Sequence, residues 1–255
     1  MEDDAPTLTP QDFLQYLASV RGVEAKTFHI PQRMIMVYRR RDFDFINQLI
    51  QGKPVGWWWY GDRIRMHVGS CNDTEIVAIE SFVGSPAAAM VLEEVIQCGA
   101  RKIIEAGISG GVQPSLKTGD IIVASEAICD EGTSRQYFQD RQRFAASTTL
   151  KQHLIAALNQ NAIDHIVGAV LTTDGVYRET RGKMAKFREM GVLAVNMETS
   201  ALYAVAEHRG VEIASAHVIS DLVLESGWQP AFVDKRVSSS AETLLRLAVE
   251  AISKA

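Results

Sequence analysis

The sequence has few cysteines, no long apolar run and no excess of positive charge, and each shortage excludes a class of protein. Its 255 residues include three cysteines, Cys71, Cys98 and Cys129. Three scattered cysteines are too few for a disulfide framework or a zinc site, so we expect free thiols in a reducing compartment. The 26 basic and 31 acidic residues give a formal net charge of −5, whereas proteins that bind nucleic acid carry a basic surplus. We therefore expect no nucleic-acid partner.

Membrane and metal signals are also missing from the sequence. No apolar run approaches the roughly 18 residues that a membrane-spanning helix needs. The first ten residues, MEDDAPTLTP, are acidic, unlike a signal peptide. The six histidines form no H-E-x-x-H or other ligand-spaced set, so we expect no metal. These features predict a cytoplasmic globular protein that does not bind membranes.

Short apolar segments alternate with helical patterns along the chain, and nothing resembling a linker or a repeat divides it. This alternation predicts one α/β domain over residues 1–255, with a loose tail at 1–8. The expected architecture has three layers, αβα, around a central, mostly parallel (mixed) sheet of the phosphorylase/hydrolase type. The expected strands are residues 34–38, 75–79, 102–104, 121–124, 166–171, 192–196 and 212–219. The first expected helix begins at Pro10, after a Thr9 cap. The other expected helices cover residues 86–98, 148–160, 183–190, 199–209 and 239–253.

Ligands of such sheets bind beyond the carboxyl ends of the strands, where five polar or glycine-rich segments of this chain should converge. The five segments are residues 80–85, 105–111, 174–178, 196–198 and 220–221. Gly84-Ser85-Pro86 begins a helix, either as an ordinary cap or as an anion site. Ser109 lies in a G-x-S-x-G string. Because Pro114 and Gly119 disfavour the helix that a nucleophile elbow requires, we interpret this string as a glycine-rich ligand loop.

Two carboxylates in these segments have the chemistry to act on a ligand. Glu198 can accept hydrogen bonds from vicinal hydroxyl groups, or it can simply favour a helix N-terminus. Asp221 follows an apolar strand and can serve as a general acid or cap the next loop. The aromatic run 57–60, WWWY, is either an interface patch or core packing, and we favour the interface.

Taken in order, these segments resemble the purine nucleoside/uridine phosphorylase family (nucleoside phosphorylase-I type), which also includes nucleosidases. The resemblance is clearest between Gly84 and Asp221. It is carried by FVGSPAAAMVLEEVIQCGA, EAGISGGVQPSLKTGDIIVASEAICDEGTS, GVLAVNMETSALYAVAEHRG and VISD. It implies an enzyme, a pentosyltransferase that cleaves the N-glycosidic bond of a nucleoside with phosphate to give the free base and ribose 1-phosphate.

The resemblance also assigns roles to individual residues. Asp221 would protonate the leaving base, and because pyrimidine-specific members carry asparagine there, the resemblance favours purines. The residues implied to bind ribose are Glu198, Met197 and His29, the last reaching a neighbouring subunit. Those implied to bind the base are Val195, Val176 and Tyr177. Those expected at the phosphate or nucleophile pocket are Gly84, Ser85, Ser109, Arg39, Arg40 and Arg41.

The chain departs from the family pattern at the phosphate-binding positions. Glu105 stands where phosphorylases carry an arginine, and Ile108 stands where they carry threonine or serine. Residues 37–42, VYRRRD, replace the G-D-P-x-R loop. Three explanations remain open. Arg39, Arg40 or Arg41 could rebuild the anion site with Arg63 or Arg65 of a neighbour. Alternatively, Glu105 could pair with a lysine or arginine while the enzyme uses water, or the protein could only bind nucleosides.

The expected partners are therefore a nucleoside and phosphate, the latter as a co-substrate, with no other cofactor. Family sites borrow residues across subunits, so the resemblance further implies a homo-oligomer, built from dimers up to a hexamer.

Overall fold

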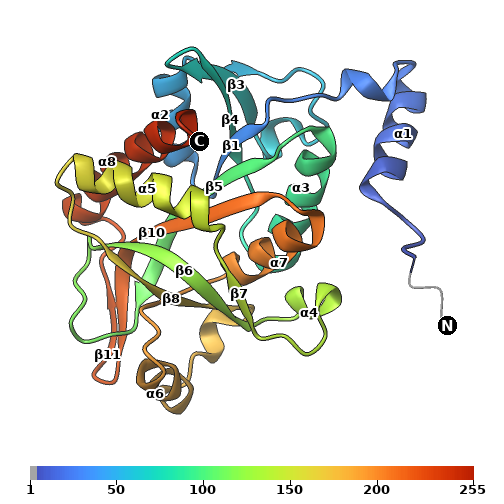
Figure 1. Cartoon of the computed structure of the whole chain (residues 1–255). Coiled ribbons are helices and arrows are strands. Elements are labelled where there is room, and N and C mark those ends of the chain that lie inside the picture. Colours follow the sequence, from blue (N-terminus) through green and yellow to red (C-terminus); the bar gives the residue numbers. More distant parts are fainter. Residues whose placement is uncertain (1–4) are drawn as a thin grey trace.

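A mixed β-sheet runs through the centre of the molecule, and helices cover both of its faces (Figure 1). The computed structural model describes residues 5–255, except for the side chain of Asp62. The strands are β1 (Arg33–Val37), β2 (Lys53–Pro54), β3 (Met66–Cys71), β4 (Thr74–Glu80), β5 (Lys102–Gly111), β6 (Ile121–Asp130), β7 (Arg143–Ala145), β8 (Ile166–Thr173), β9 (Ala194–Asn196), β10 (Glu212–Leu224) and β11 (Gly227–Pro230). The helices are α1 (Pro10–Arg21), α2 (Arg40–Ile50), α3 (Ser85–Cys98), α4 (Ser134–Tyr137), α5 (Thr148–Gln160), α6 (Arg181–Glu189), α7 (Thr199–Arg209) and α8 (Lys235–Ser253), with 3₁₀ turns η1 (Ala25–Thr27), η2 (Gly61–Arg63) and η3 (Val176–Arg178). The predicted three-layer αβα fold is confirmed.

The strand pairings close part of the sheet into a ring. β4, β1, β5 and β10 pair in parallel, and β2 and β3 extend this part of the sheet as antiparallel strands. β5 also pairs with β9, β9 with β8, β8 with β6, and β6 with β10. The long strands β5 and β10 therefore lie side by side at the junction of the open sheet and the ring, with ten residues of each in register.

The apolar core lies in two layers, one on each face of the sheet. Helices α3 and α7 pack over one face, whereas α2, α5 and α8 pack over the other. Residues 34–37 of β1 and 76–79 of β4 are continuously apolar and buried because both faces of these strands are covered. This burial holds the carboxyl ends of β1, β5 and β10 at one edge, where the site described below lies.

The first helix begins and ends where the sequence predicts. The Thr9 side chain accepts a hydrogen bond from the backbone N–H of Asp12, and the Asp12 carboxylate accepts one from the N–H of Thr9, which completes a capping box. Gly22 ends the helix with φ of 65°, a conformation that favours glycine. Of the predicted loose tail, residues 1–4 lie outside the described residues, and residues 5–8 are exposed and form no helix or strand.

One prediction for local structure was wrong. The strand expected at 102–104 continues to Gly111, so Ser109 lies in a strand and not in a glycine-rich loop. Pairing with β10 and β9 supplies the backbone hydrogen bonds that hold this glycine-rich segment extended. Helix α2, which begins at Arg40, and strand β3 were not predicted.

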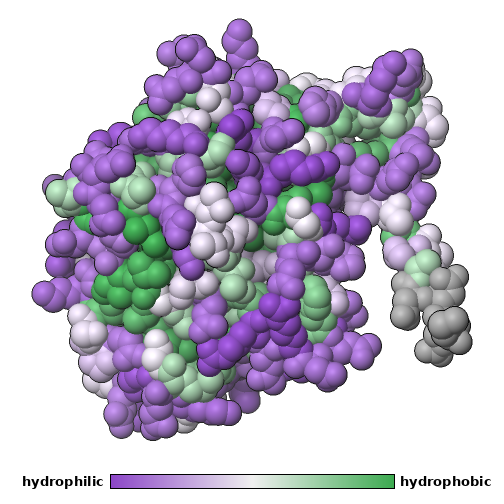
Figure 2. Space-filling model, in the orientation of Figure 1, coloured by the Kyte–Doolittle hydropathy of each residue, from purple (hydrophilic) through white to green (hydrophobic). Residues whose placement is uncertain are grey.

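The aromatic run 57–60 packs within the chain, so the structure does not support our preference for an interface. Trp58 is buried, and the Trp59 ring lies 5.6 Å from that of Phe13 on α1. The Trp57 ring lies 5.3 Å from that of Phe28. These rings therefore hold α1, which Figures 1 and 2 show at the margin of the molecule, against the body.

Glu131 of the D-E-G-T-S motif ties α4 to the start of α7. Its buried carboxylate accepts hydrogen bonds from the backbone N–H groups of Thr133 and Ser134 and from the Ser134 hydroxyl. It also accepts one from the Ser200 hydroxyl at 2.9 Å. The motif therefore supports the helix that follows Glu198.

Replacing Glu131 with alanine should lower the free energy of unfolding by about 2–4 kcal/mol, because several buried donors lose their acceptor. Urea unfolding measures this loss. Glu242→Ala, at an exposed position of α8, is the matched control and should change stability by less than about 0.5 kcal/mol. Equal stability of the two variants would contradict the structural role of Glu131.

Candidate functional site

A cavity of about 680 Å³ opens where β1, β5, β9 and β10 end. Its walls come from segments that are far apart in the sequence, as expected for a site beyond the carboxyl ends of the strands. It is lined by Tyr38, Arg39, Asp42, Val83, Gly107, Ile108, Ser109, Gly110, Val176, Tyr177, Glu179, Val195, Asn196, Met197, Glu198, Ser220, Asp221, Val223, Trp228 and Phe232. A larger hollow of about 1040 Å³ lies beside α1 and is lined by none of the residues predicted for the site.

Most of the predicted site residues meet in this cavity. Those that line it are Asp221, Glu198, Met197, Val195, Val176, Tyr177, Ser109 and Arg39. Gly84 and Ser85 support its wall, since the Gly84 N–H donates to Glu198 and the Ser85 hydroxyl donates to the carbonyl of Met197. His29 lies elsewhere, in a hollow of about 430 Å³ lined also by Trp57.

Glu198 is a buried carboxylate that two backbone N–H groups hold in place. Oε1 accepts from Gly84 at 2.8 Å, and Oε2 accepts from Met197 at 3.1 Å. Burial raises the pKa of Glu198 to about 7, and the negative charge of Glu105 adds to this effect, although the two backbone hydrogen bonds oppose it. Each oxygen keeps a free lone pair that can accept from a ligand hydroxyl group.

Asn196 and Thr172 shape the turn that carries Glu198. Asn196 Oδ1 accepts from the Thr172 hydroxyl at 2.8 Å and, more weakly, from the backbone N–H groups of Glu198 and Thr199. Its amide donates to the Thr199 hydroxyl at 2.8 Å. The N-M-E-T-S motif thus forms a rigid connection from β9 to α7, which fixes the Glu198 backbone.

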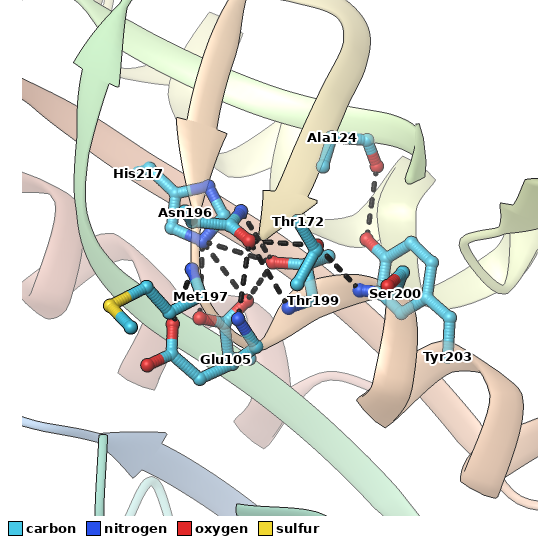
Figure 3. A network of polar contacts seen from close by, with 10 residues as sticks. Glu105, Ala124, Thr172, Asn196, Met197, Thr199, Ser200, Tyr203 and His217 are labelled. Atoms are coloured by element: carbon cyan, nitrogen blue, oxygen red, sulfur yellow. Dashed lines mark hydrogen bonds and ion pairs between the residues drawn. The ribbon is translucent and has the colours of Figure 1, made fainter. Parts of the chain in front are cut away.

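Beneath Glu198, Glu105 forms a fully buried ion pair with His217 of β10 (Figure 3). His217 Nε2 lies 3.0 Å from one Glu105 oxygen and 3.1 Å from the other, and the Thr199 hydroxyl donates to Glu105 at 3.2 Å. Burial by itself would raise the pKa of Glu105, but the charge and hydrogen bond of His217 hold it below its usual value. Burial would lower the pKa of His217, and the Glu105 charge raises it instead. The partner of Glu105 is therefore a histidine, not the lysine or arginine that we considered.

Tyr38 stands where the family pattern has its glycine-rich phosphate loop. Its ring lies close to Gly107, since a Cβ added at that glycine would be 3.4 Å from the ring. Its buried hydroxyl has no hydrogen-bond partner within residues 5–255. Burial, followed by the charges of Glu105 and Glu198, raises the pKa of Tyr38 well above its usual value. A neutral phenol thus borders the two carboxylates.

The carboxylate of Asp221 accepts two hydrogen bonds. The Ser220 hydroxyl donates to Oδ1 at 2.7 Å, and the indole N–H of Trp228 donates to Oδ2 at 2.8 Å. Trp228 belongs to β11, which pairs with β10 and brings the indole over the cavity. Gly110 lies close to this carboxylate, since a Cβ there would be 3.3 Å from Asp221 Oδ2 and 3.1 Å from the Val223 side chain.

The three consecutive arginines differ in their polar partners and in their distance from the cavity. Arg39 lines the cavity and donates from Nε and a terminal nitrogen to both oxygens of buried Asp42, at 2.6 and 2.9 Å. Arg40 pairs with Glu80, and Arg41 donates to Ser238 and also lies 3.5 Å from Asp42 Oδ1. Only Arg39 of the three therefore lies among the cavity-lining residues.

The sequence did not point to several cavity residues, notably Glu179, Trp228, Phe232 and Tyr38, whereas Asn196 belongs to the predicted segment 196–198. Glu179 lies two residues after the predicted base-binding pair Val176–Tyr177, and that proximity was the one available signal. Trp228 enters the site only through the β10–β11 hairpin. His217, beneath the cavity, lies inside an apolar strand where a core histidine is the usual interpretation.

The described residues contain no group of three or more histidine, cysteine, aspartate or glutamate side chains suited to a metal ion. None of the helices in this part of the chain is long and apolar enough to cross a membrane.

The fold and the site define a three-layer αβα protein with a carboxylate-lined cavity at the strand ends. A family model described as the phosphorylase superfamily matches residues 43–253, and the chain belongs to that superfamily. The guanosine phosphorylase of Halorubrum lacusprofundi is 22% identical over 188 residues, which are 72% of this chain and 78% of that protein. The DeoD-type purine nucleoside phosphorylase of Bacillus cereus is 35% identical over 141 residues, which are 54% of this chain and 60% of that enzyme.

The solved structures agree on the fold. A uridine phosphorylase of Vibrio fischeri superposes with a TM-score of 0.79 at 23% identity, covering 90% of this chain and 95% of that chain. The family predicted from the motifs is confirmed by the family model over residues 43–253.

His217→Leu should lower the free energy of unfolding by about 3–5 kcal/mol, because it leaves the Glu105 charge buried without a partner. The double variant Glu105→Leu/His217→Leu should lose less than the single variant, since neither charge remains. Urea unfolding at pH 6 measures both.

The stability advantage of the wild type over the double variant should shrink as pH rises. The pKa of His217 is higher in the folded state than the value of about 6.5 in the unfolded state. Its charge therefore stabilises the folded state fully at pH values below about 6.5, and this stabilisation is lost as pH rises through the folded-state pKa. A double variant that is less stable than His217→Leu would contradict the ionised pair.

Proposed function

We propose that the protein is a nucleoside phosphorylase that acts on purine nucleosides, with inorganic phosphate as the co-substrate and no other cofactor. The observation that carries the proposal is the placement of Glu198 and Asp221 in one cavity with Val195, Val176 and Tyr177. The names of the guanosine and purine nucleoside phosphorylase relatives support the same activity. A cytoplasmic homo-oligomer, built from dimers up to a hexamer with His29 completing a neighbour's site, stays a prediction.

In this proposal Glu198 holds the sugar. Its two oxygens, each fixed by a backbone N–H, accept hydrogen bonds from the 2′- and 3′-hydroxyl groups of ribose. As the glycosidic bond breaks, the ribose becomes oxocarbenium-like, and a nearby carboxylate stabilises the positive charge. Met197 lies beside Glu198 in the cavity wall and packs against the sugar.

Asp221 acts at the base. A purine leaves more readily once N7 carries a proton, and general acid catalysis of this kind typically contributes about 10²–10⁴-fold. Asp221 is held by Ser220 and Trp228, so its position relative to the base is well defined. Phosphate then attacks the anomeric carbon, and ribose 1-phosphate and the free base leave.

Arg39 is the proposed phosphate ligand, because it is the only arginine or lysine among the described residues that line the cavity. Its Asp42 partner orients the guanidinium group. Arg40 and Arg41, which pair with Glu80 and Ser238, are not part of this proposal. Gly84, Ser85 and Ser109 remain candidates for the wall of the nucleophile pocket.

Hydrolysis by water is the alternative reaction that the charges of the cavity allow. Glu105, Glu198 and the neutral phenol of Tyr38 occupy the region where phosphate binding would need positive charge. His217 balances Glu105 but adds no net charge to the region. A neutral water molecule can enter such a site at a lower electrostatic cost than a phosphate dianion.

Asp221→Asn should lower kcat/KM for purine nucleosides by about 10²–10⁴-fold, because the amide cannot donate the required proton. Glu198→Gln should lower it by about 10²-fold, because it removes the charge beside the sugar. Spectrophotometric release of the base measures both rates. Exposed Asp140→Asn is the control and should match the wild type. Rates within a fewfold of wild type in both site variants would refute the site assignment.

Base release should require phosphate and saturate with it. Arg39→Lys keeps a charge opposite Asp42 but loses the planar fork, so it should raise KM for phosphate by about tenfold. Arg143→Gln, on an exposed ion pair with Glu126, should leave KM unchanged. Equal base release in phosphate-free buffer, unaffected by Arg39→Lys, would establish hydrolysis instead.

A further inference from the structure

Two carboxylates from different elements share the base end of the cavity, and they differ in how tightly they are held. Asp221 accepts hydrogen bonds at both oxygens. Glu179, which follows η3 and precedes α6, also lines the cavity, and its carboxylate makes no hydrogen bond or ion pair within residues 5–255. The carboxylate of Glu179 is therefore the one that is free to meet a ligand.

Glu179 lies near the part of the cavity that would hold the edge of the purine with N7 and the substituent at position 6. It follows Val176 and Tyr177, the proposed base-binding pair, and lies close enough to Asp221 to feel its charge. In the proposed function, Asp221 faces N7 of the purine. The neighbouring group on that edge is the substituent at position 6, which is a donor in adenine (amino) and an acceptor in guanine or hypoxanthine (oxo).

We propose that Glu179 reads the substituent at position 6 of the purine, accepting from a 6-amino group when ionised and donating to a 6-oxo group when protonated. The inference rests on the proposed function, because it assumes a purine with N7 at Asp221. It makes Glu179 a specificity-determining residue, with preference between 6-amino and 6-oxo purine nucleosides set by pH.

Burial and the charges around Glu179 bring its pKa close to neutral pH. Burial raises the pKa of Glu179 to about 7, and the charges of Asp221 on β10 and Asp130 on β6 contribute in the same direction. Lys183 on α6 opposes them but is itself paired with Asp130, which also accepts from the Thr173 hydroxyl. Burial and Asp221 therefore outweigh the lysine.

The other titratable groups of the cavity wall are Tyr38, Arg39, Asp42, Tyr177, Glu198 and Asp221. They act on the sugar, the phosphate or the part of the base that both nucleosides share. Their pH dependence therefore cancels in the ratio of kcat/KM for adenosine to kcat/KM for inosine, measured from pH 6 to pH 8.

For the wild type this ratio should rise by at least about tenfold, because the protonated fraction of Glu179 falls from about nine-tenths to about one-tenth across this range. Glu179→Gln, which has both a donor and an acceptor at every pH, should give a ratio that does not change with pH. Glu189→Gln, on the exposed side of the adjacent α6, is the matched control and should keep the wild-type rise. A flat wild-type ratio, or the same rise in Glu179→Gln, would overturn the proposal.

Calorimetric binding of adenine and hypoxanthine over the same pH range separates this inference from the proposed function. In one outcome no nucleoside is cleaved, but the ratio of the two dissociation constants shifts with pH in the wild type and not in Glu179→Gln. That outcome refutes catalysis and supports the role of Glu179. Cleavage of both nucleosides at a pH-independent ratio refutes the role of Glu179 and leaves the phosphorylase standing. Binding of neither base refutes both.

Discussion

The buried ion pair between Glu105 and His217 joins the parts of the molecule that make the site. Glu105 lies on β5 and His217 on β10, the two long strands where the open sheet meets the ring, and Thr199 adds the first turn of α7. A charge in this position is tolerable only with its partner, since removing one of two buried charges leaves the other uncompensated. The pair therefore constrains the register of two strands and the helix that follows Glu198.

The same pair determines the electrostatics of the cavity. It contributes no net charge. The electrostatic potential of the pocket therefore depends on three lining carboxylates that have no ion-pair partner within residues 5–255, Glu198, Asp221 and Glu179, and on the Arg39–Asp42 pair. These carboxylates differ in the hydrogen-bond donors that hold them. Glu198 is held by backbone N–H groups, Asp221 by side-chain donors and Glu179 by neither. Such differences let similar groups in one site hold a sugar, position a proton and read a base.

Local signals predicted much of the fold, and contacts between distant segments explain the failures. The helices at 148–160 and 199–209 were predicted with the observed ends, and the Thr9 cap marks the observed start of α1. In contrast, the extended glycine-rich end of β5 depends on β9 and β10, which no local pattern reveals. Among the cavity residues, Glu198 and Asp221 lie in motifs, whereas Glu179 and Trp228 reach the cavity through η3 and a hairpin. His217 as the partner of Glu105 required the strand register.

A crystal structure of Asp221→Asn with a bound purine nucleoside would test the central claim most directly, because the variant should bind substrate and turn it over slowly. The account predicts the nucleoside in the 680 Å³ cavity, with the ribose hydroxyl groups on Glu198 and the N7 edge of the purine facing position 221. A nucleoside bound instead in the larger hollow beside α1, or in the reverse orientation with its base on Glu198, would contradict it.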